Sequence, residues 1–374
     1  MRVALVTGTL DPGGAERQLV RLAHELDRRG HTVKIFLLQG GGLLTTNVAA
    51  YGLESESWDF DGFLPRRPVH TAKAMLRAAR SLRRFRPDVV HAYLEVAYLL
   101  AIPLSWLLRV PVRVSGRRGG TPGEGQHYRT RLARSLHRQS IRCSDAIVAN
   151  SASVAASAIE IEHVDPAKIR VIENGVDIPE HPCSVGGPDP LGIVVANLRP
   201  VKNHAGLLRA LALLSCPPRI RLVGEGPERA SLEDLASDLG LAGTVEFAGF
   251  VPDAAACFAT AQFSLLVSRY EGQPNAVLES MAHGVPVVAT AIPGIAGVLE
   301  HDVEGLLVPV GDDEALAAAI DAISTDAALR MRLGAAARER AIRFGWDRCT
   351  DAHLDLYREL LGDRGSQGRG PGAA

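Results

Sequence analysis

The sequence predicts an α/β protein built from two doubly wound, parallel β-sheets. Three observations support this fold class. Short Val/Ile/Leu-rich runs alternate with longer amphipathic segments, one Pro- and Gly-rich stretch interrupts them, and the chain has 374 residues. Alternating strands and helices favour parallel sheets with crossover helices, and single cores usually stop growing below this length. We therefore expect two domains whose strand ends face one cleft.

The predicted strands form two series, one in residues 1–178 and one in residues 191–345. Each is short and almost wholly apolar, which is typical of strands buried on both faces. Between the series, Pro179–Pro190 is dense in Pro and Gly and is predicted to be the interdomain linker. We expect strands at Val3–Val6, Val33–Leu38, Val89–His91, Val112–Val114, Ile147–Ala149 and Arg170–Ile172, and then at Gly192–Ala196, Ile220–Val223, Val245–Phe247, Phe263–Val267, Val285–Ala289 and Gly305–Val308.

The C-terminal end divides into a helix and a tail. Residues 346–361 are predicted to form a helix with Leu354, Tyr357, Leu360 and Leu361 on one side. Residues 362–374 are Gly-rich and almost without hydrophobic side chains, so we expect a disordered tail.

Composition excludes several classes of protein. Five scattered cysteines without a C-x-x-C pair speak against a disulfide framework or a zinc cage. The N-terminus enters a strand at once and lacks the apolar region of a signal peptide. The longest apolar run, Val96–Leu108, contains no charged residue, but it is too short to span a bilayer and is predicted to be a buried helix. We expect a cytoplasmic protein.

Charge is unevenly distributed along the chain. Residues 1–178 contain 25 Lys and Arg against 17 Asp and Glu, whereas the remainder contains 16 against 25. Two predicted amphipathic helices, within Lys73–Phe85 and Arg129–Arg142, carry much of the excess. Their cationic faces are either simply solvated or attract anionic lipid headgroups or a phosphate-bearing acceptor. No basic groove with interleaved aromatic residues appears, so we expect no nucleic-acid partner.

Two glycine-containing turns follow predicted strands. Asp11–Glu16 includes Gly13 and Gly14 and opens a helix, where backbone N–H groups can approach an anion, although a tight turn alone also needs glycine. Gly224 ends the strand Ile220–Val223 in a second such turn, which is informative only through its position.

A cationic loop, Asn197–His204, lies between a predicted strand and a predicted helix. Arg199 and Lys202 stand near the helix N-terminus, where a cation opposes the helix dipole by up to about 1 kcal/mol. A bound anion removes that conflict. Because Arg can grip phosphate oxygens bidentately and Lys adds a point charge, a diphosphate fits better than a single carboxylate.

The most specific segment is Glu271–Ala289. Asn275 is predicted to cap a short helix that ends at Gly284. With that cap, Glu279 falls at the fourth helical position, so a capping box does not explain it. The N–H groups of Asn275 and Ala276, next to Glu271, would make a place for a phosphate between two carboxylates.

At this point the chain resembles the retaining GT-B glycosyltransferases that carry an E-x7-E motif. Glu271 and Glu279 have that spacing, and Gly13-Gly14, Lys202 and Gly224-x-Gly226 agree in order and spacing with the family. Such enzymes have two Rossmann-like domains and a last helix that crosses back to the first. The resemblance implies that residues 1–178 bind the acceptor and residues 191–345 the nucleotide sugar. Around the motif, Gly272, Pro274, Asn275, Leu278, Met281, Gly284, Pro286 and Val287 also match the family pattern.

The resemblance implies a role for each site residue. Arg199 and Lys202 would neutralise the donor diphosphate, Glu279 would bind the ribose, and Glu271 would orient or stabilise the transferred sugar. His91 stands where many members have His-x-His, here His91-Ala92-Tyr93, and is either catalytic or a buried, hydrogen-bonded histidine. The implied donor-binding set is Gly13, Gly14, Asn197, Gly224, Gly272, Pro274, Asn275, Ala276 and Glu279.

The implied activity is transfer of a sugar, with retention, from a UDP or GDP sugar to a hydroxyl of a lipid-linked, glycan or small-molecule acceptor. Cell-surface polysaccharide or glycolipid assembly is the expected context, in the cytoplasm or on the inner face of the membrane. No permanently bound cofactor is expected, and the need for a metal stays open, because no D-x-D stands in a suitable place. Two rivals remain: a nucleotide-sugar 2-epimerase and a non-catalytic sugar-nucleotide-binding subunit.

Overall fold

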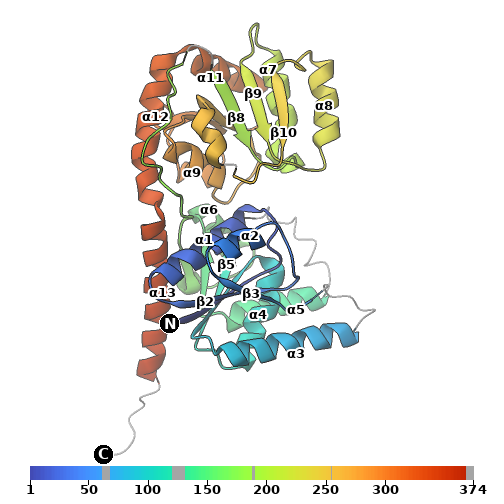
Figure 1. Ribbon diagram of the computed structural model, residues 1–374, viewed down its shortest axis with the longest axis vertical. Helices are drawn as coiled ribbons and strands as arrows, with labels where there is room; N and C mark the ends of the chain where they lie inside the picture. The colour runs from blue at the N-terminus through green and yellow to red at the C-terminus, as the bar shows by residue number, and fades with distance from the viewer. Residues whose placement is uncertain (61–67, 120–130, 188–189, 254, 368–374) are drawn as a thin grey trace, which may run out of the picture. The chain divides into compact units, whose positions relative to one another are not determined.

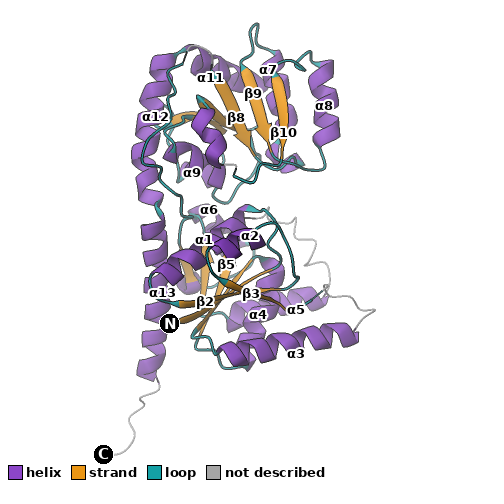
Figure 2. Ribbon diagram, in the orientation of Figure 1, coloured by secondary structure: helices purple, strands orange, loops and turns teal. Residues whose placement is uncertain are grey.

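The computed structural model describes residues 1–60, 68–119, 131–187, 190–253 and 255–367. The chain forms two compact units, each with its own β-sheet (Figures 1 and 2). Unit 1 contains Met1–Gly175 together with the chain from Trp346 onward, and unit 2 contains Val176–Gly345. Both sheets are parallel, which confirms the predicted α/β class.

Unit 1 is built on a seven-stranded parallel sheet in the order β3-β2-β1-β4-β5-β6-β7. Strand β3, at one edge, was not predicted, because the sequence Glu-Ser-Glu-Ser has no apolar residue. The strands are β1 (Arg2–Thr7), β2 (Thr32–Leu37), β3 (Glu54–Ser57), β4 (Val89–Tyr93), β5 (Val112–Arg117), β6 (Ala146–Ala149) and β7 (Ile169–Val171).

Helices cover both faces of this sheet because its strands are apolar on both sides. On β1, Val3 and Leu5 join the core formed with α1 (Gly14–Arg28), α2 (Thr45–Ala50) and α13 (Trp346–Gln367). Ala4 and Val6 join the opposite core, formed with α3 (Pro68–Phe85), α4 (Glu95–Leu107) and α5 (Arg131–Cys143). Unit 1 also contains α6 (Ala152–Glu160) and the 3-10 turn η2 (Pro166–Lys168).

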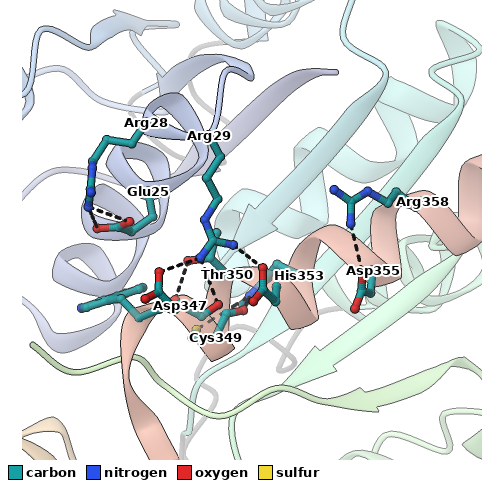
Figure 3. A network of polar contacts seen from close by, with 11 residues as sticks. Glu25, Arg28, Arg29, Asp347, Cys349, Thr350, His353, Asp355 and Arg358 are labelled. Carbon is teal, nitrogen blue, oxygen red and sulfur yellow. Dashed lines mark hydrogen bonds and ion pairs between the residues drawn. The ribbon is translucent and has the colours of Figure 1, made fainter. Parts of the chain in front are cut away.

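Helix α13 belongs to unit 1 although it lies at the far end of the chain. Leu354 and Tyr357 are buried in the same core as α1. The Arg29 guanidinium lies 2.9 Å from Asp347 Oδ1 (Figure 3). It also lies 2.5 Å from Asp351 Oδ1. The structure describes this helix as far as Gln367, six residues beyond the predicted helix end at residue 361. Adding a residue to an anchored helix costs far less than nucleating one, because each added residue gains one backbone hydrogen bond. Residues 368–374 lie outside the described chain.

Unit 2 is built on a six-stranded parallel sheet in the order β10-β9-β8-β11-β12-β13. All six strands were predicted, with ends that differ by a residue or two. The strands are β8 (Leu191–Val195), β9 (Arg219–Val223), β10 (Val245–Gly249), β11 (Phe263–Leu266), β12 (Val287–Thr290) and β13 (Gly305–Val308).

The helices of unit 2 also form two layers. One core joins the sheet to α7 (His204–Ala212), α8 (Arg229–Asp238) and α11 (Asp313–Thr325). Another joins the opposite face to α9 (Asn275–Ala282), α10 (Pro293–Ala296) and α12 (Ala327–Ala341). Three 3-10 turns complete the unit, η3 (Pro200–Lys202), η4 (Ala255–Thr260) and η5 (Ile342–Phe344). Within the described ranges, no helix combines the length and apolar character needed to cross a membrane.

The segment predicted to link the two domains packs on unit 2 over its described part. The boundary between the units falls at Gly175, before the linker begins. Buried Arg330 donates hydrogen bonds to the carbonyl oxygens of Val185 and Gly187, and the Cys183 N–H donates to His283 O at 2.8 Å. A Pro- and Gly-rich segment lacks regular hydrogen bonds of its own, and here the Arg330 side chain and the backbone of unit 2 supply them. Residues 188–189 of the predicted linker lie outside the described chain.

Candidate functional site

The predicted donor residues of unit 2 gather where the order of its strands reverses. The chain passes from β8 outward through β9 and β10, then returns to β11 on the other side of β8. Open α/β sheets bind ligands beyond the carboxyl ends of their strands at such a switch point. The cationic loop follows β8 and the segment with Glu271 follows β11, so both lie at this place.

Lys202 and Glu271 are in direct contact. Lys202 Nζ lies 2.5 Å from Glu271 Oε1, and the hydroxyl of Ser268 donates to the same oxygen at 2.7 Å. The two charged side chains retain 22% and 13% of their exposure, so the pair is half-buried yet open to solvent. Their positions in the chain differ by 69, and the pairing of β8 with β11 brings them together.

A second contact joins the same two loops through Arg269, which the sequence analysis missed. Its backbone N–H donates to Val201 O at 2.8 Å, and its guanidinium donates to Asn203 Oδ1 at 3.3 Å. Asn203 is buried and left-handed, with φ +54°. Arg269 is itself exposed, so it adds a third cation to Arg199 and Lys202 at this site.

Arg199 lies exposed at the start of η3, and within the described chain its side chain makes no ion pair. Its backbone N–H donates to Asn197 O at 2.9 Å. Asn197 is also exposed. The cationic loop therefore presents Arg199 without an ion pair in the described chain and Lys202 paired with Glu271.

Gly224 packs against the backbone of the cationic loop and has no side chain that could bind a ligand. A Cβ on Gly224 would lie 2.1 Å from Ala196 O, and one on Gly226 would lie 2.3 Å from Leu198 O. The Leu198 N–H donates to Glu225 O at 3.0 Å. Only glycine permits this backbone approach, and at Gly224 the φ of +147° adds to the requirement.

The Glu271–Glu279 segment forms the loop and helix that the sequence predicted, with one correction at the cap. Pro274 occupies the N-cap position with extended backbone angles, and Asn275 is the first residue of α9. The ψ of Pro274 is 116°, which is the extended conformation of an N-cap residue, and its carbonyl oxygen accepts hydrogen bonds from the N–H groups of Val277 and Leu278. The N–H groups of Asn275 and Ala276 precede these bonds in the first turn, where no helix carbonyl is in reach.

Both ends of the segment are fixed. Gly272 and Pro274 are buried, whereas Asn275, Ala276 and Glu279 are half-buried. After α9, Gly284 has φ +73°, its N–H donates to Met281 O, and the next N–H donates to Ser280 O. This Schellman arrangement ends the helix at the predicted glycine.

The loop that carries Glu271 also rests on Gly294 in α10. A Cβ on Gly294 would lie 2.3 Å from Glu271 O and 2.6 Å from Gly272 O. From the other side, the hydroxyl of Thr290 donates to Ser268 O at 2.5 Å. Neither contact was visible in the sequence, because each depends on strand order rather than on local spacing.

His204 lies buried at the first position of α7, directly after the cationic loop. Burial, together with the charge of Lys202, lowers its pKa to about 4. Neither ring nitrogen has a hydrogen-bond partner within the described chain. The imidazole is therefore neutral at pH 7 and leaves the positive charge of the loop to its neighbours.

In unit 1, Gly13 and Gly14 open α1 as predicted, but a carboxylate of the chain already lies there. A Cβ on Gly13 would lie 2.1 Å from Glu16 Oε2, so this side chain folds over Gly13. Burial raises the pKa of Glu16, and Asp11 raises it further, against a hydrogen bond from its own backbone that lowers it. The donor-binding role of these glycines stays a prediction.

His91 is fully buried in β4. Its Nδ1 lies 2.7 Å from the hydroxyl oxygen of Tyr357 in α13, and its ring lies beside Tyr93 and His353. Burial lowers its pKa well below the ordinary value, with smaller effects from His353 and Arg118. Of the two interpretations left open, this environment favours the buried, hydrogen-bonded histidine.

Tyr93, which faces the same side as His91, contacts a cation. The Arg118 guanidinium lies 4.3 Å from the ring centre and donates to the Tyr93 hydroxyl at 2.6 Å and to Asn174 Oδ1 at 2.7 Å. No cluster of three or more His, Cys, Asp or Glu suited to a metal ion occurs in the part of the chain that the structure describes.

Comparison with known proteins shows that each half of the chain matches a protein family. The family described as "Glycosyltransferase Family 4" matches residues 12–180, and that described as "Glycosyl transferases group 1" matches residues 185–340. A D-inositol 3-phosphate glycosyltransferase of Mycolicibacterium paratuberculosis is 30% identical over 98% of this chain and 90% of its own. The lipopolysaccharide core biosynthesis glycosyltransferase LpsD of Rhizobium meliloti is 30% identical over 92% of this chain and 95% of its own.

Solved structures share the fold at lower identity. Anabaena HepE in complex with UDP and glucose superposes with a TM-score of 0.82 at 21% identity, over 97% of this chain and all of its own. Sucrose-phosphate synthase of Thermosynechococcus elongatus superposes with a TM-score of 0.79 at 20% identity, over 97% and 100% of the two chains.

Proposed function

This chain belongs to the group 1 and family 4 glycosyltransferases of GT-B fold, and on that premise we propose that it transfers a sugar from a nucleotide diphosphate sugar to a hydroxyl acceptor with retention of configuration. The donor is proposed to bind to unit 2, beyond the carboxyl ends of β8 and β11.

The observation that carries this proposal is the contact between Lys202 and Glu271 at the switch point of the sheet. A cation beside a carboxylate, both partly open to solvent, suits a ligand that has an anionic group next to hydroxyl groups. A diphosphate joined to a sugar has that composition. The exposed guanidinium of Arg199 and the first turn of α9 extend the anion-binding surface.

The proposed chemistry assigns each group a separate task. Lys202 and Arg199 stabilise the negative charge that develops on the diphosphate as its bond to the sugar breaks. The amides of Asn275 and Ala276 hold phosphate or sugar oxygens, Glu271 orients the sugar, and Glu279 binds the ribose. When the donor binds, Lys202 exchanges part of its contact with Glu271 for the diphosphate, which frees that carboxylate for a sugar hydroxyl.

Retention is proposed to follow from attack of the acceptor on the face that the diphosphate leaves, with the departing phosphate taking the acceptor proton. The acceptor is proposed to be a hydroxyl of a cell-surface glycan, a glycolipid or a small polyol. Relatives named for lipopolysaccharide core and for inositol 3-phosphate support this range. The HepE complexes with UDP and with UDP-glucose support a UDP sugar as the first donor to test.

Calorimetric titration with UDP- and GDP-sugars, followed by an assay of nucleotide diphosphate release, tests the proposal. Lys202→Met should weaken donor binding about 10- to 100-fold, since a hydrogen bond to a charged group contributes about 1.5–3 kcal/mol. Lys202→Arg keeps the charge and serves as the matched control, with a smaller loss expected. NMR of the product should show the anomeric configuration of the donor.

The same experiment separates the rival functions. A 2-epimerase would convert the sugar without releasing nucleotide when no acceptor is present, and a binding subunit would bind the donor without either reaction. An unchanged affinity in Lys202→Met would place the donor elsewhere in the chain.

A further inference from the structure

The outward side of α3 combines exposed cations with exposed apolar residues. Val69, Lys73, Leu76, Arg80 and Arg83 follow one another at spacings of four and three residues, so they form one line along the helix. We call these five residues the outer stripe. Val69 is 67% exposed and Leu76 is 47% exposed, although both side chains are apolar.

The cations of the outer stripe differ from the other cations of α3. Arg77 pairs with Asp59, and Arg84 lies 2.7 Å from Glu56 Oε2, so these two are neutralised at the flank of the helix. Lys73, Arg80 and Arg83 make no ion pair with any residue that the structure describes. The stripe therefore presents three uncompensated positive charges around two apolar side chains.

The end of α4 also exposes apolar residues beside a cation. Trp106 is 54% exposed and Leu107 is 68% exposed, and Arg109 beside them is exposed as well. Helix α3 leads into β4 and α4 leads into β5, which are adjacent parallel strands, so both helices end on the side of the sheet where these strands begin. Both also pack in the same core against the same face of the sheet, as Figure 1 shows.

We propose that the outer stripe of α3 and the Trp106–Leu107 end of α4 bind the surface of an anionic lipid bilayer. Amphipathic helices with basic and apolar residues on the outward side lie in the headgroup region, where each basic residue gains from the negative surface potential. Tryptophan is enriched at that boundary because its ring is apolar and its N–H is polar. This surface belongs to unit 1, and the proposal does not depend on the donor assigned to unit 2.

Co-sedimentation with vesicles tests the charges of the stripe. The full chain should bind phosphatidylglycerol-containing vesicles and not phosphatidylcholine vesicles at low ionic strength. The double variant Lys73→Gln/Arg80→Gln should bind about 30-fold more weakly, from about 1 kcal/mol for each basic residue near the surface. The matched control Arg77→Gln/Arg84→Gln removes the same charge from the same helix, and its binding should stay within about threefold of the wild type.

Trp106 provides an independent readout of the contact. The other two tryptophans, Trp58 and Trp346, are buried, so a change in emission reports on Trp106. Anionic vesicles should shift the emission to shorter wavelength, and brominated lipid should quench it. Trp106→Phe should abolish both effects.

Two results would overturn the proposal: no binding to vesicles of either composition, or equal weakening by the two double variants. In the first case an acidic macromolecule becomes the better occupant of this surface. Donor titrations of the same variants should match the wild type in every case, so a failure here is separable from a failure of the donor assignment.

Discussion

Replacing Gly294 with alanine should damage the donor site without removing any polar group. Gly294 lies in α10 and supports the loop that carries Glu271. An added Cβ would lie 2.3 Å from Glu271 O and 2.6 Å from Gly272 O. Ordinary contacts of a Cβ begin at 3.4 Å, so the loop or the helix must move by about 1 Å. Both clashing atoms are backbone oxygens, so rotation of a side chain cannot relieve the contact.

Two effects of different size follow from that displacement. Overpacking of a filled interior typically costs about 1–3 kcal/mol of stability. A displacement of about 1 Å at groups that position a substrate can cost about 100-fold in rate. We therefore expect Gly294→Ala to remain folded with a lower melting temperature, and to lose about 100-fold in turnover of its donor.

Gly297→Ala is the matched control, because a Cβ there would meet nothing within 4 Å and the residue is already right-handed. Nucleotide diphosphate release and donor titration should be measured on both variants, with circular dichroism to verify the fold. If Gly294→Ala retains wild-type turnover within threefold, the support of the Glu271 loop by α10 is refuted.

Two further changes test the electrostatics and the packing of unit 2. Since the folded state lowers the pKa of His204 from 6.5 to about 4, the unfolded state binds more protons between these values, and stability is lost as the pH falls. The free energy of unfolding should therefore fall by about 2 kcal/mol between pH 7.5 and pH 5 because of this group. Over the same pH range, the urea midpoint of His204→Phe should fall less than that of the wild type. An equal fall in the two proteins would contradict this. Arg330 is 2% exposed and donates to four backbone carbonyls, so Arg330→Met should cost about 3 kcal/mol. The control is Arg332→Met, which removes an exposed ion pair with Asp302 and should lower the stability by less than about 1 kcal/mol in thermal melts. Similar losses of stability in both variants would argue against a structural role for Arg330.

The sequence predicts most strands of this fold because a buried parallel strand is a continuous apolar run. Strand β3 lacks that signal. It forms because its backbone pairs with β2 and because Lys34 of β2 lies 3.0 Å from Glu54 Oε2 and 3.1 Å from Glu56 Oε2. These contacts are specified by the partner strand, so no local pattern in Glu54–Ser57 indicates them.

The candidate site divides in the same way. The spacing of Glu271 and Glu279 and the cations of the β8 loop are local, and the sequence predicts them. The contacts of Arg269 and Gly294 with those loops exist only because β11 and β12 follow β8 in the sheet. The burial of His91 depends on a residue of α13 that lies 266 positions away, so its motif alone leaves its role open.

The most direct measurement of the central claim is an experimental structure of the chain with an intact or hydrolysed nucleotide sugar. We expect the two phosphates at the carboxyl ends of β8 and β11, with a phosphate oxygen within about 3 Å of Lys202 Nζ and the ribose at Glu279. A nucleotide bound at any other edge of unit 2, with the Lys202–Glu271 contact unchanged and no phosphate near it, would contradict the account.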